Sequence, residues 1–511
     1  MRDPESTIST PTEAENRARP CLAARILCHP NLARVGDFTP LFDERGTGTI
    51  AIHRHAPEFR SADARTVLPL QSQRVTRSPL HVTKFERGVV LRFDEASPPV
   101  VVNGTPLIGE RSISNEALAR GVVVLFGRYL VLWIGWLQLV EPAPLVQGLV
   151  GESSVMRHLR QQIHRVAPME VPVLVRGETG VGKELVARAL HGVGLRDKQE
   201  YVAVNVASIP PSTAASELFG HKRGAFTGAT EDRKGYFLQA HKGTLFLDEI
   251  GEVSFDVQAL LLRAVQNGVI QPVGGVLRQV DVRLIAATDA DLEAAVARRE
   301  FREPLLRRFS YEIHVPPVRA RRDDIGLLFY HLLRERLEAT GEGHLLVASG
   351  AEEEPWVPGS YVADMAQYDW PGNVRELSSV ALSFIVENKQ RARGRITDEL
   401  RRLITPREPP REDAVPPESA KGNTDALSDE ALKRALRDSG YSAEKAARRL
   451  GVSKSYFYKR IEKSKLLRGA RALELDEIHA AVSTCGGDIA QAAARLEVSE
   501  RALRLRLRGA T

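Results

Sequence analysis

The spacing of apolar residues changes along the chain and divides it into regions. Between residues 22 and 140 the apolar residues come in short runs, with turn residues between them. Short runs rich in β-branched side chains and bounded by turn residues are typical of β-strands. We therefore predict an all-β module over 22–140, after a disordered N-terminal segment at 1–21. The predicted strands are Thr49–Ile52, Gly88–Phe93, Val100–Val102, Gly121–Phe126 and Tyr129–Ile134.

From residue 147 the pattern changes to apolar strands that alternate with helical segments, as in a parallel α/β core. We predict such a core over 147–318 and a mainly helical domain over 319–395. A linker is predicted over 396–424, because the stretch from Thr405 to Pro417 has prolines and charges but little to bury. The apolar strands expected in the core are Val171–Arg176, Thr244–Leu247 and Val282–Ala286.

The C-terminal part contains an internal repeat. Residues 440–461 align with residues 486–507 at an offset of 46 residues, with Gly, Ala-Ala, Arg, Leu and Val-Ser in register. Repetition at a fixed offset indicates two copies of one structural unit. We predict two helical units, at 425–465 and 470–511, so that the fold class is multidomain: all-β, then α/β with a helical domain, then all-α.

Composition fits a multidomain globular protein. The 511 residues are 43% hydrophobic and 27% charged, and a chain of this length calls for three or four domains. The polar start and the interruption of the apolar stretch 121–140 by Arg128 argue against a signal peptide or a membrane span. Cys21, Cys28 and Cys485 lack metal-ligand spacing and suit a reducing compartment. A cytoplasmic location without membrane association is expected.

The positive charge is concentrated at the C-terminal end. Residues 425–511 contain 18 Lys and Arg against 12 Asp and Glu, an excess that equals the net charge of +6 of the whole chain. A basic helical tail indicates binding to phosphate polyanions such as DNA. Charge alone also fits a solvated helical surface.

A glycine-rich loop follows the strand that ends at Arg176 and precedes a helical pattern, as the G-x-x-x-x-G-K phosphate-binding loop (P-loop) requires. Its backbone N–H groups turn toward the phosphates, and Lys183 reaches the β- and γ-phosphate oxygens. Glu184 stands where a general P-loop has Ser or Thr for magnesium. The predicted nucleotide-binding residues are Gly177, Glu178, Thr179, Gly180, Val181, Gly182, Lys183 and Glu184.

Asp248 and Glu249 follow directly on an apolar strand. In an ATPase the first carboxylate holds Mg²⁺ through water, and the second polarises the attacking water. Paired acids at a strand end are also common as solvated caps, but the P-loop upstream favours the catalytic interpretation. ATP and Mg²⁺ are therefore the expected cofactors.

The hexapeptide at 224–229 reads Gly-Ala-Phe-Thr-Gly-Ala, a mobile loop with one apolar side chain that cannot be buried locally. Next to a P-loop, this hexapeptide resembles the contact loop of the AAA+ activators that remodel RNA polymerase carrying sigma-54. Glu184 and the lid motif Trp-Pro-Gly-Asn-Val-Arg-Glu-Leu at 370–377 agree with that family, and a second loop at 273–280 resembles the one that supports the first. The residues that the resemblance assigns to sigma-54 contact are Gly224, Ala225, Phe226, Thr227, Gly228 and Ala229.

The same resemblance implies roles for further residues. Asn205 would restrain Glu249, and Arg375 would reach the phosphates from the helical lid. Arg302 and Arg308 correspond to arginine fingers that reach the nucleotide of a neighbouring subunit, with Arg307 as an additional candidate. Because fingers act in trans, the working unit would be a ring, a hexamer of this chain.

The sensor I strand ends in Thr288 and Asp289, whereas the family usually has asparagine at the second position. An aspartate there adds negative charge near the γ-phosphate. Reduced but measurable ATP turnover is expected.

The repeated tail unit resembles the Fis-type helix-turn-helix. Ser453 caps the expected recognition helix of the first copy, and Glu497 in the second copy replaces the turn glycine Gly451. Packing alone would also explain the second copy. The predicted DNA-binding residues are Lys454, Ser455, Tyr456, Lys459, Arg460, Arg501 and Arg504.

The N-terminal module resembles a forkhead-associated (FHA) domain, a β-sandwich that binds phosphothreonine. Ile-His-Arg at 52–54 and Val-Thr-Arg at 75–77 stand where that family has its phosphate contacts. Arg54, Thr76 and Arg77 are the candidate residues, and a β-sandwich used only for protein contacts is the alternative.

Two functions remain open at this point. The first is a sigma-54-dependent activator that binds enhancer DNA, receives its signal through the FHA-like domain from a phosphothreonine protein or kinase, and uses ATP hydrolysis to remodel the sigma-54 RNA polymerase holoenzyme. The second is a DNA-binding regulator with a weakened ATPase that acts by occupancy.

Overall fold

The computed structural model describes most of the first four fifths of the chain and short parts of the tail. Two compact units divide between Pro406 and Arg407, and each is described by itself. The described residues are 20–405 except for 62–65, 72–77, 95–98, 139–143 and 347–354, and then 434, 437, 439, 475–486, 488–496 and 503.

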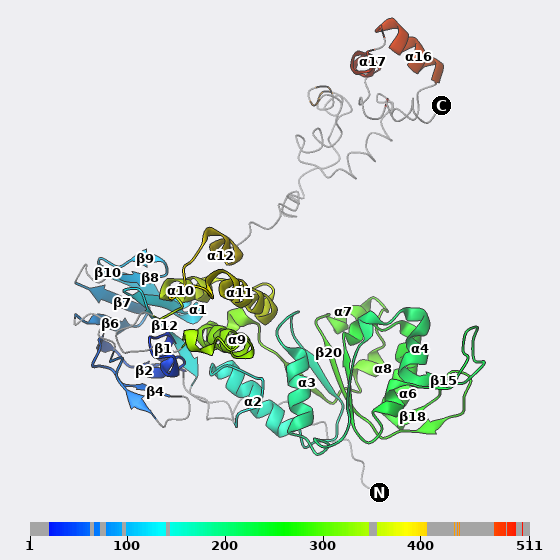
Figure 1. Cartoon of the computed structure of the whole chain (residues 1–511), viewed down its shortest axis with the longest axis horizontal. Helices are drawn as coiled ribbons and strands as arrows, with labels where there is room; N and C mark the ends of the chain where they lie inside the picture. The colour runs from blue at the N-terminus through cyan, green and yellow to red at the C-terminus, as the bar shows by residue number, and fades with distance from the viewer. Residues whose placement is uncertain are drawn as a thin grey trace. The chain divides into compact units, whose positions relative to one another are not determined.

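The N-terminal region, called the β-module (residues 20–138), is a sandwich of two sheets whose paired strands are antiparallel (Figure 1). One sheet has the order β5-β4-β2-β1-β12-β11-β8-β9 and the other β10-β7-β6-β3. The five predicted strands are confirmed, and a short helix, α1 (Asn115–Arg120), adds to them. The strands are β1 Pro20–Cys28, β2 Phe38–Asp43, β3 Gly48–Ile52, β4 Phe59–Arg60, β5 Val67–Leu68, β6 Leu80–Phe85, β7 Gly88–Phe93, β8 Val100–Val102, β9 Thr105–Pro106, β10 Gly109–Ser114, β11 Val122–Phe126 and β12 Leu130–Gln138.

Strand β1 was not predicted, and it is buried on both faces. Because side chains alternate along a strand, Leu22, Ala24 and Ile26 point into the sandwich. Ala23 and Cys28 lie on the other face, in a second apolar cluster. β1 begins at Pro20, so the predicted module boundary at residue 22 is two residues late.

The α/β core contains a five-stranded parallel sheet of order β14-β17-β20-β13-β21. Helices cover both faces, and β17 divides its side chains between them: Leu245 and Leu247 join one apolar cluster and Phe246 the other. The predicted α/β core is confirmed. Its main elements are α2 Ser154–Val166, β13 Val173–Arg176, α3 Lys183–Gly192, β14 Tyr201–Asn205, α4 Pro211–Phe219, β17 Thr244–Asp248, α6 Phe255–Asn267, β20 Arg283–Thr288, α7 Leu292–Ala297, α8 Glu303–Leu306 and β21 Tyr311–His314.

A helical lid follows the core. Its helices are α9 Ile325–Ala339, α10 Gly359–Gln367, α11 Asn373–Asn388 and α12 Asp398–Leu403. The last helix lies within the predicted linker, whose start at residue 396 is therefore wrong. Leu400 is fully buried and Ile404 nearly so in the apolar cluster of the lid, so the lid extends beyond residue 396.

The lid packs on the outer face of the β-module (Figure 1). Trp133 of β12 and Ala23 of β1 share one buried cluster with Phe329 and Tyr361 of the lid helices. The approach is close, since a Cβ added to Gly326 in α9 would lie 2.0 Å from the backbone oxygen of Leu27. The two regions therefore have a common hydrophobic core.

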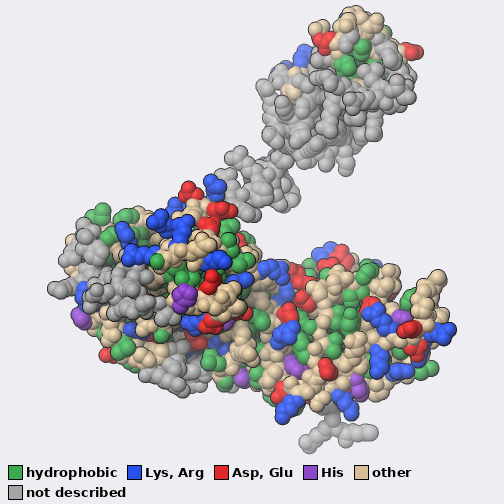
Figure 2. Space-filling model, viewed as in Figure 1, with side chains coloured by type: hydrophobic (Ala, Val, Ile, Leu, Met, Phe, Trp, Pro, Cys, Tyr) green, Lys and Arg blue, Asp and Glu red, His purple; other side chains and the backbone are tan. Residues whose placement is uncertain are grey.

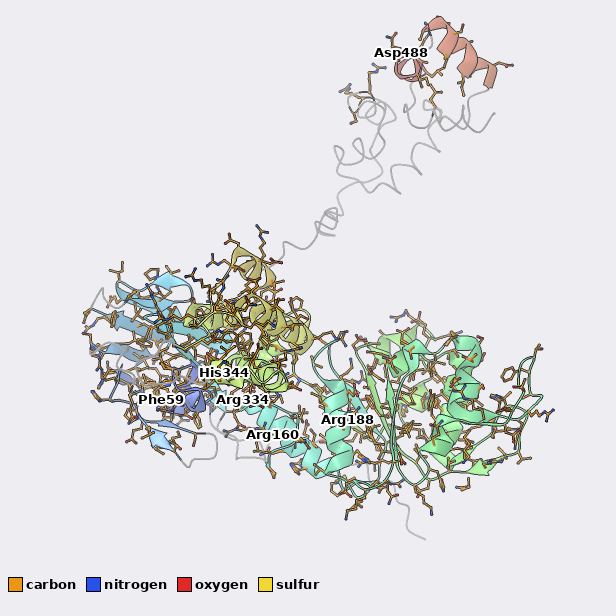
Figure 3. The ribbon with its side chains drawn as sticks, viewed as in Figure 1. Phe59, Arg160, Arg188, Arg334, His344 and Asp488 are labelled. Atoms are coloured by element: carbon orange, nitrogen blue, oxygen red, sulfur yellow. The ribbon has the colours of Figure 1, made fainter. Side chains whose placement is uncertain are left out.

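Buried polar groups join the same regions to the start of the core. Arg25 of β1 forms an ion pair with Asp323 at 3.2 Å and donates to the backbone oxygen of Glu152 at 3.1 Å. Asp324 accepts hydrogen bonds from the backbone and hydroxyl groups of Ser153, the residue before α2. Arg160, labelled on α2 in Figure 3, donates to the Glu152 side chain at 3.1 Å.

In the C-terminal unit, the described residues include helices α16 (Leu475–Thr484) and α17 (Ile489–Arg495). Ile478, Ala481 and Ala492 form a small apolar cluster with Leu503. This helical pair lies within the predicted second repeat. No helix in the described parts of the chain is long and apolar enough to cross a membrane.

Candidate functional site

The P-loop connects the end of β13 to the start of α3. Gly180 and Gly182 have φ angles of +80° and +102°, in the left-handed region that favours glycine. A Cβ at Gly180 would lie 2.5 Å from the backbone oxygen of Gly372, at the start of lid helix α11. These glycines therefore shape the loop and also let the lid approach it.

Lys183 is the first residue of α3, and its side chain is buried at the predicted phosphate site. Its Nζ donates to the backbone oxygen of Gly177 at 3.0 Å and lies 3.7 Å from Oε1 of Glu249. Both contacts hold the ammonium group between the P-loop and the acidic end of β17. A helix N-terminus together with a lysine suits a phosphate group.

Asp248 and Glu249 stand at the end of β17, as predicted. Burial raises the pKa of both carboxyl groups, and Lys183 opposes this shift. Oδ1 of Asp248 is buried and has no hydrogen-bond partner among the described residues. An unsatisfied carboxylate oxygen next to a P-loop fits a Mg²⁺ ligand, either directly or through water. Glu249 has a φ of +55°, so its backbone turns sharply away from the strand.

The sensor I residues reach the same place. Thr288 is buried, and its hydroxyl accepts from the backbone N–H of Ala290 at 3.0 Å. Thr179 in the P-loop donates to Oδ2 of Asp289 at 2.5 Å, and this bond lowers the pKa of Asp289. The Asp289 charge contributes to the raised pKa of Glu249. Three carboxylates thus surround Lys183.

Asn205 and Arg375 are attached to different parts of this site. Asn205 is paired with Asp248 across β14 and β17, so it lies one strand away from the catalytic acids. The backbone N–H of Arg375 donates to the backbone oxygen of Gly180 at 3.3 Å, while its side chain is exposed. Restraint of Glu249 by Asn205 stays a prediction.

The predicted finger residues flank the short helix α8. The Arg302 guanidinium lies 3.8 Å from the ring centroid of Phe255, and its Nε donates to the Phe255 backbone oxygen at 2.9 Å. Arg307 is paired with Glu303 one turn away, and both Arg307 and Arg308 are exposed. Because a finger acts on a neighbouring subunit, a single chain does not test this assignment.

The hexapeptide lies in the loop between the short strands β15 (Gly220–His221) and β16 (Arg233–Lys234). Gly224 and Gly228 have φ angles of +78° and +101°, and nothing would contact a Cβ at either position. Phe226 is 45% exposed, and its ring makes a T-shaped contact with His221 at a centroid distance of 5.0 Å. The described loop therefore presents an apolar side chain to solvent, as predicted.

The second loop supports the first. It lies between β18 (Val269–Ile270) and β19 (Arg278–Gln279). The backbone N–H of Lys222 donates to the backbone oxygen of Val273 at 3.0 Å, and a Cβ at Gly274 would lie 2.8 Å from that of Ala225. Figure 2 shows Lys and Arg side chains gathered at this end of the core.

The remaining predicted residues are mostly outside the described part of the chain. Arg54 lies in the turn after β3. The predicted phosphopeptide and DNA-binding residues outside the described part are Thr76, Arg77, Lys454, Ser455, Tyr456, Lys459, Arg460, Arg501 and Arg504.

The structure also reveals site residues that sequence reasoning missed. Arg319 and Asn373, both from the lid, bond to Glu178 of the P-loop. Asn373 lies inside the lid motif, but nothing in the sequence indicated its partner. Arg188, labelled on α3 in Figure 3, pairs with Glu184 at 2.8 Å.

Two known protein families match the regions that contain the nucleotide site and the lid. Residues 149–314 match the sigma-54 interaction domain, and residues 319–397 match the AAA+ ATPase lid domain. The regulatory protein LuxO of Vibrio cholerae is 44% identical over 249 residues, which are 48% of this chain and 45% of LuxO. The transcriptional regulatory protein ZraR of Escherichia coli is 40% identical over 314 residues, which are 60% of this chain and 66% of ZraR.

Among solved structures, NtrX from Brucella abortus in complex with ATP is 30% identical with a TM-score of 0.44, over 62% of this chain and 68% of that chain. The chain spans less than two thirds of the length of LuxO and ZraR. Over the matched residues, the chain is thus homologous to these regulators and carries a sigma-54 interaction domain with an AAA+ lid.

Proposed function

We propose that this protein is a sigma-54-dependent transcriptional activator that couples ATP hydrolysis to remodelling of the polymerase. The observation that carries the proposal is the exposed Phe226, held on a glycine-hinged loop in the same domain as the P-loop and the acids after it. An apolar side chain that a domain leaves exposed on a loop is a candidate protein contact. The match to the sigma-54 interaction domain supports sigma-54 as the partner.

The nucleotide site supports hydrolysis. The P-loop backbone and Lys183 would hold the phosphates, and Asp248 would hold Mg²⁺, which neutralises phosphate charge when bound. Glu249 is suited to accept a proton from water, because burial raises the pKa of its carboxyl group and so makes the carboxylate a stronger base. Arg302 and Arg308 would complete the site of a neighbouring subunit in a hexameric ring.

Replacement of Phe226 tests the proposal. F226A should abolish ATP-dependent open-complex formation at a sigma-54 promoter and leave ATP hydrolysis largely intact, because the ring lies away from the nucleotide. F85A is the matched control, since Phe85 is a half-exposed aromatic residue of the β-module. Full open-complex formation by F226A would remove the remodelling function.

Occupancy without remodelling is the second candidate, and Asp289 favours it. Its carboxylate lies beside Thr179 and adds negative charge where the γ-phosphate would bind. Open complexes that form equally well with ATP and with a non-hydrolysable analogue would support occupancy. Dependence on hydrolysis would support the activator.

The DNA and signal partners complete the proposal. The basic tail and the helical pair α16 and α17 support binding of enhancer DNA by the C-terminal unit. Loss of enhancer binding after deletion of residues 486–511 would assign DNA contact to the second repeat. The two-sheet β-module supports an FHA-like input domain. Titration of the wild-type protein and of R54A with phosphothreonine peptides tests this role.

A further inference from the structure

The carboxylate of Glu178, the second residue of the P-loop, contacts two residues of the lid. Nη1 of Arg319 donates to its Oε2 at 2.7 Å, and Nη2 of Arg319 donates to Oε1, so that the pair is bidentate. Nδ2 of Asn373 also donates to Oε2, at 3.1 Å. A bidentate pair fixes direction as well as distance. Glu178 therefore joins the phosphate-binding loop to the lid.

The amide of Asn373 binds two segments other than its own helix. Its Nδ2 also donates to the backbone oxygen of Thr179 at 3.1 Å, and its Oδ1 accepts from the backbone N–H of Val318 at 3.0 Å. The residue is fully buried and has a φ of +51°. Its side chain thus connects the P-loop, the segment that enters the lid and the first turn of α11. Arg375 follows two residues later on the same helix.

The ion pair itself is not a major source of stability. Both side chains are more than two fifths exposed, and exposed pairs contribute little to folding. The charge matters for another reason, because an unpaired carboxylate in a phosphate-binding loop would repel ATP. Arg319, with help from Asn373, lowers the pKa of Glu178 to about 2, so the carboxylate is ionised and compensated.

We propose that Glu178, Arg319 and Asn373 form a clamp that orients the lid on the P-loop and thereby places Arg375 at the nucleotide. The three are positioning residues, since their side chains act on the lid and the loop. The inference rests on the proposed function only in that the ligand is ATP. It adds a role for the Glu178 side chain beyond its place in the phosphate-binding motif.

Steady-state ATP hydrolysis by the full chain tests the clamp in a double-mutant cycle. R319Q should raise the KM for ATP about tenfold, because it leaves the carboxylate of Glu178 unpaired beside the phosphates. E178Q should have a smaller effect, and E178Q/R319Q should recover most of the loss in R319Q. Two effects that simply add would contradict coupling between the residues. R298Q/E300Q, which removes an exposed pair at 2.7 Å, is the control and should match the wild type.

Lid orientation is measured separately as the distance between two spin labels by pulsed electron paramagnetic resonance. The labels are attached at R298C and V386C, and C485S removes a competing cysteine. Both label sites are exposed, one in the core and one on α11. E178Q should broaden the distance distribution in the presence of a non-hydrolysable ATP analogue. Unchanged distances together with an unchanged KM would overturn the clamp, even if R319Q had a lowered unfolding temperature.

The two proposals fail in different ways. A wild-type protein that binds ATP without hydrolysing it would contradict the proposed function, and the clamp would then be read from ATP affinity with the same variants. A wild type that hydrolyses ATP while none of the clamp variants changes KM, affinity or label distance would contradict the clamp alone.

Discussion

Two of the lid's attachments differ in character. Toward the β-module it shares a continuous apolar core, in which Trp133, Phe329 and Tyr361 are almost entirely buried. Toward the P-loop it makes a few polar contacts that include the half-exposed pair of Arg319 and Glu178. Apolar cores are close-packed and resist relative movement, whereas polar contacts exchange readily with water and ligands. We therefore expect the lid and the β-module to behave as one unit, and the polar contacts at the P-loop to be the ones that respond to the nucleotide.

One short segment serves both attachments. Arg319 bonds to the P-loop, and Asp323, four residues later, pairs with Arg25 of the β-module. The contact with the P-loop and the contact with the β-module are therefore only four residues apart in the chain. Variants on the module side should therefore change stability, and variants on the nucleotide side should change the rate of ATP hydrolysis.

The largest effect is expected from R25M. Arg25 and Asp323 are 3% and 6% exposed, and removal of one partner leaves a buried carboxyl group with its charge uncompensated. The free energy of unfolding should fall by about 3–5 kcal/mol at pH 8. R92M is the control, since it breaks an exposed pair in the same module and should cost about 0–1 kcal/mol. Equal effects of the two variants in urea unfolding would contradict a rigid attachment between the lid and the β-module.

The pH dependence of stability gives a second test of the buried pair between Arg25 and Asp323. Burial raises the pKa of Asp323 to about 7 from an ordinary value of 3.8, although Arg25 beside it favours the ionised form. Because the folded state then holds this proton more tightly than the unfolded state, the contribution of Asp323 to stability is full below pH 4 and is lost as the pH rises through about 7. Unfolding of D323N between pH 5 and 8 should depend less on pH than that of the wild type, and equal slopes would contradict the assignment.

A smaller loss is expected from G326A. The added Cβ would lie 2.0 Å from the Leu27 backbone oxygen, so α9 must move away from β1. Overpacking of this kind typically costs about 1–3 kcal/mol, seen as a lower unfolding midpoint. G343A in the same lid meets only ordinary contacts and should be neutral. An unchanged midpoint for G326A would mean that the shared core is looser than described.

On the nucleotide side, D289N should raise ATP turnover severalfold, which corresponds to an activation free energy lower by roughly 1 kcal/mol. The free energy of unfolding should change little. The substitution removes negative charge beside Thr179 and Glu249. D291N is the control, because Asn also caps α7 and the same charge is lost two residues away. No rise in turnover for D289N would remove the interpretation of Asp289 as a brake.

Sequence patterns predicted the features that depend on residues close together in the chain. The P-loop, the acids after β17 and the short strands of the β-module follow from local spacing, and the structure places each of them where expected. The contact between Cys28 and Tyr330, 302 positions apart, leaves no periodic trace in either segment. Helix α12 was missed because nearby prolines outweighed Leu400 and Ile404, whose burial depends on the rest of the lid.

The clamp was missed for a related reason. Glu178 was assigned to the nucleotide because the motif includes it, whereas its carboxylate bonds to Arg319 and Asn373. Motifs record which residues recur around a ligand, and they do not say which way each side chain points. β1 could have been recognised, because Pro20–Cys28 is apolar at both odd and even positions except for Arg25, as expected of a strand covered on both faces.

Strand β1 also limits how this architecture can be recombined. A foreign input domain fused in place of residues 20–138 would leave α9 and α10 without the surface that covers them. The unit to be exchanged is therefore discontinuous in the sequence. The β-module and the lid have to be replaced together, while the α/β core that lies between them in the sequence can stay. Chimeras with junctions near residues 148 and 318 should fold, whereas a single junction near 148 should give aggregated protein.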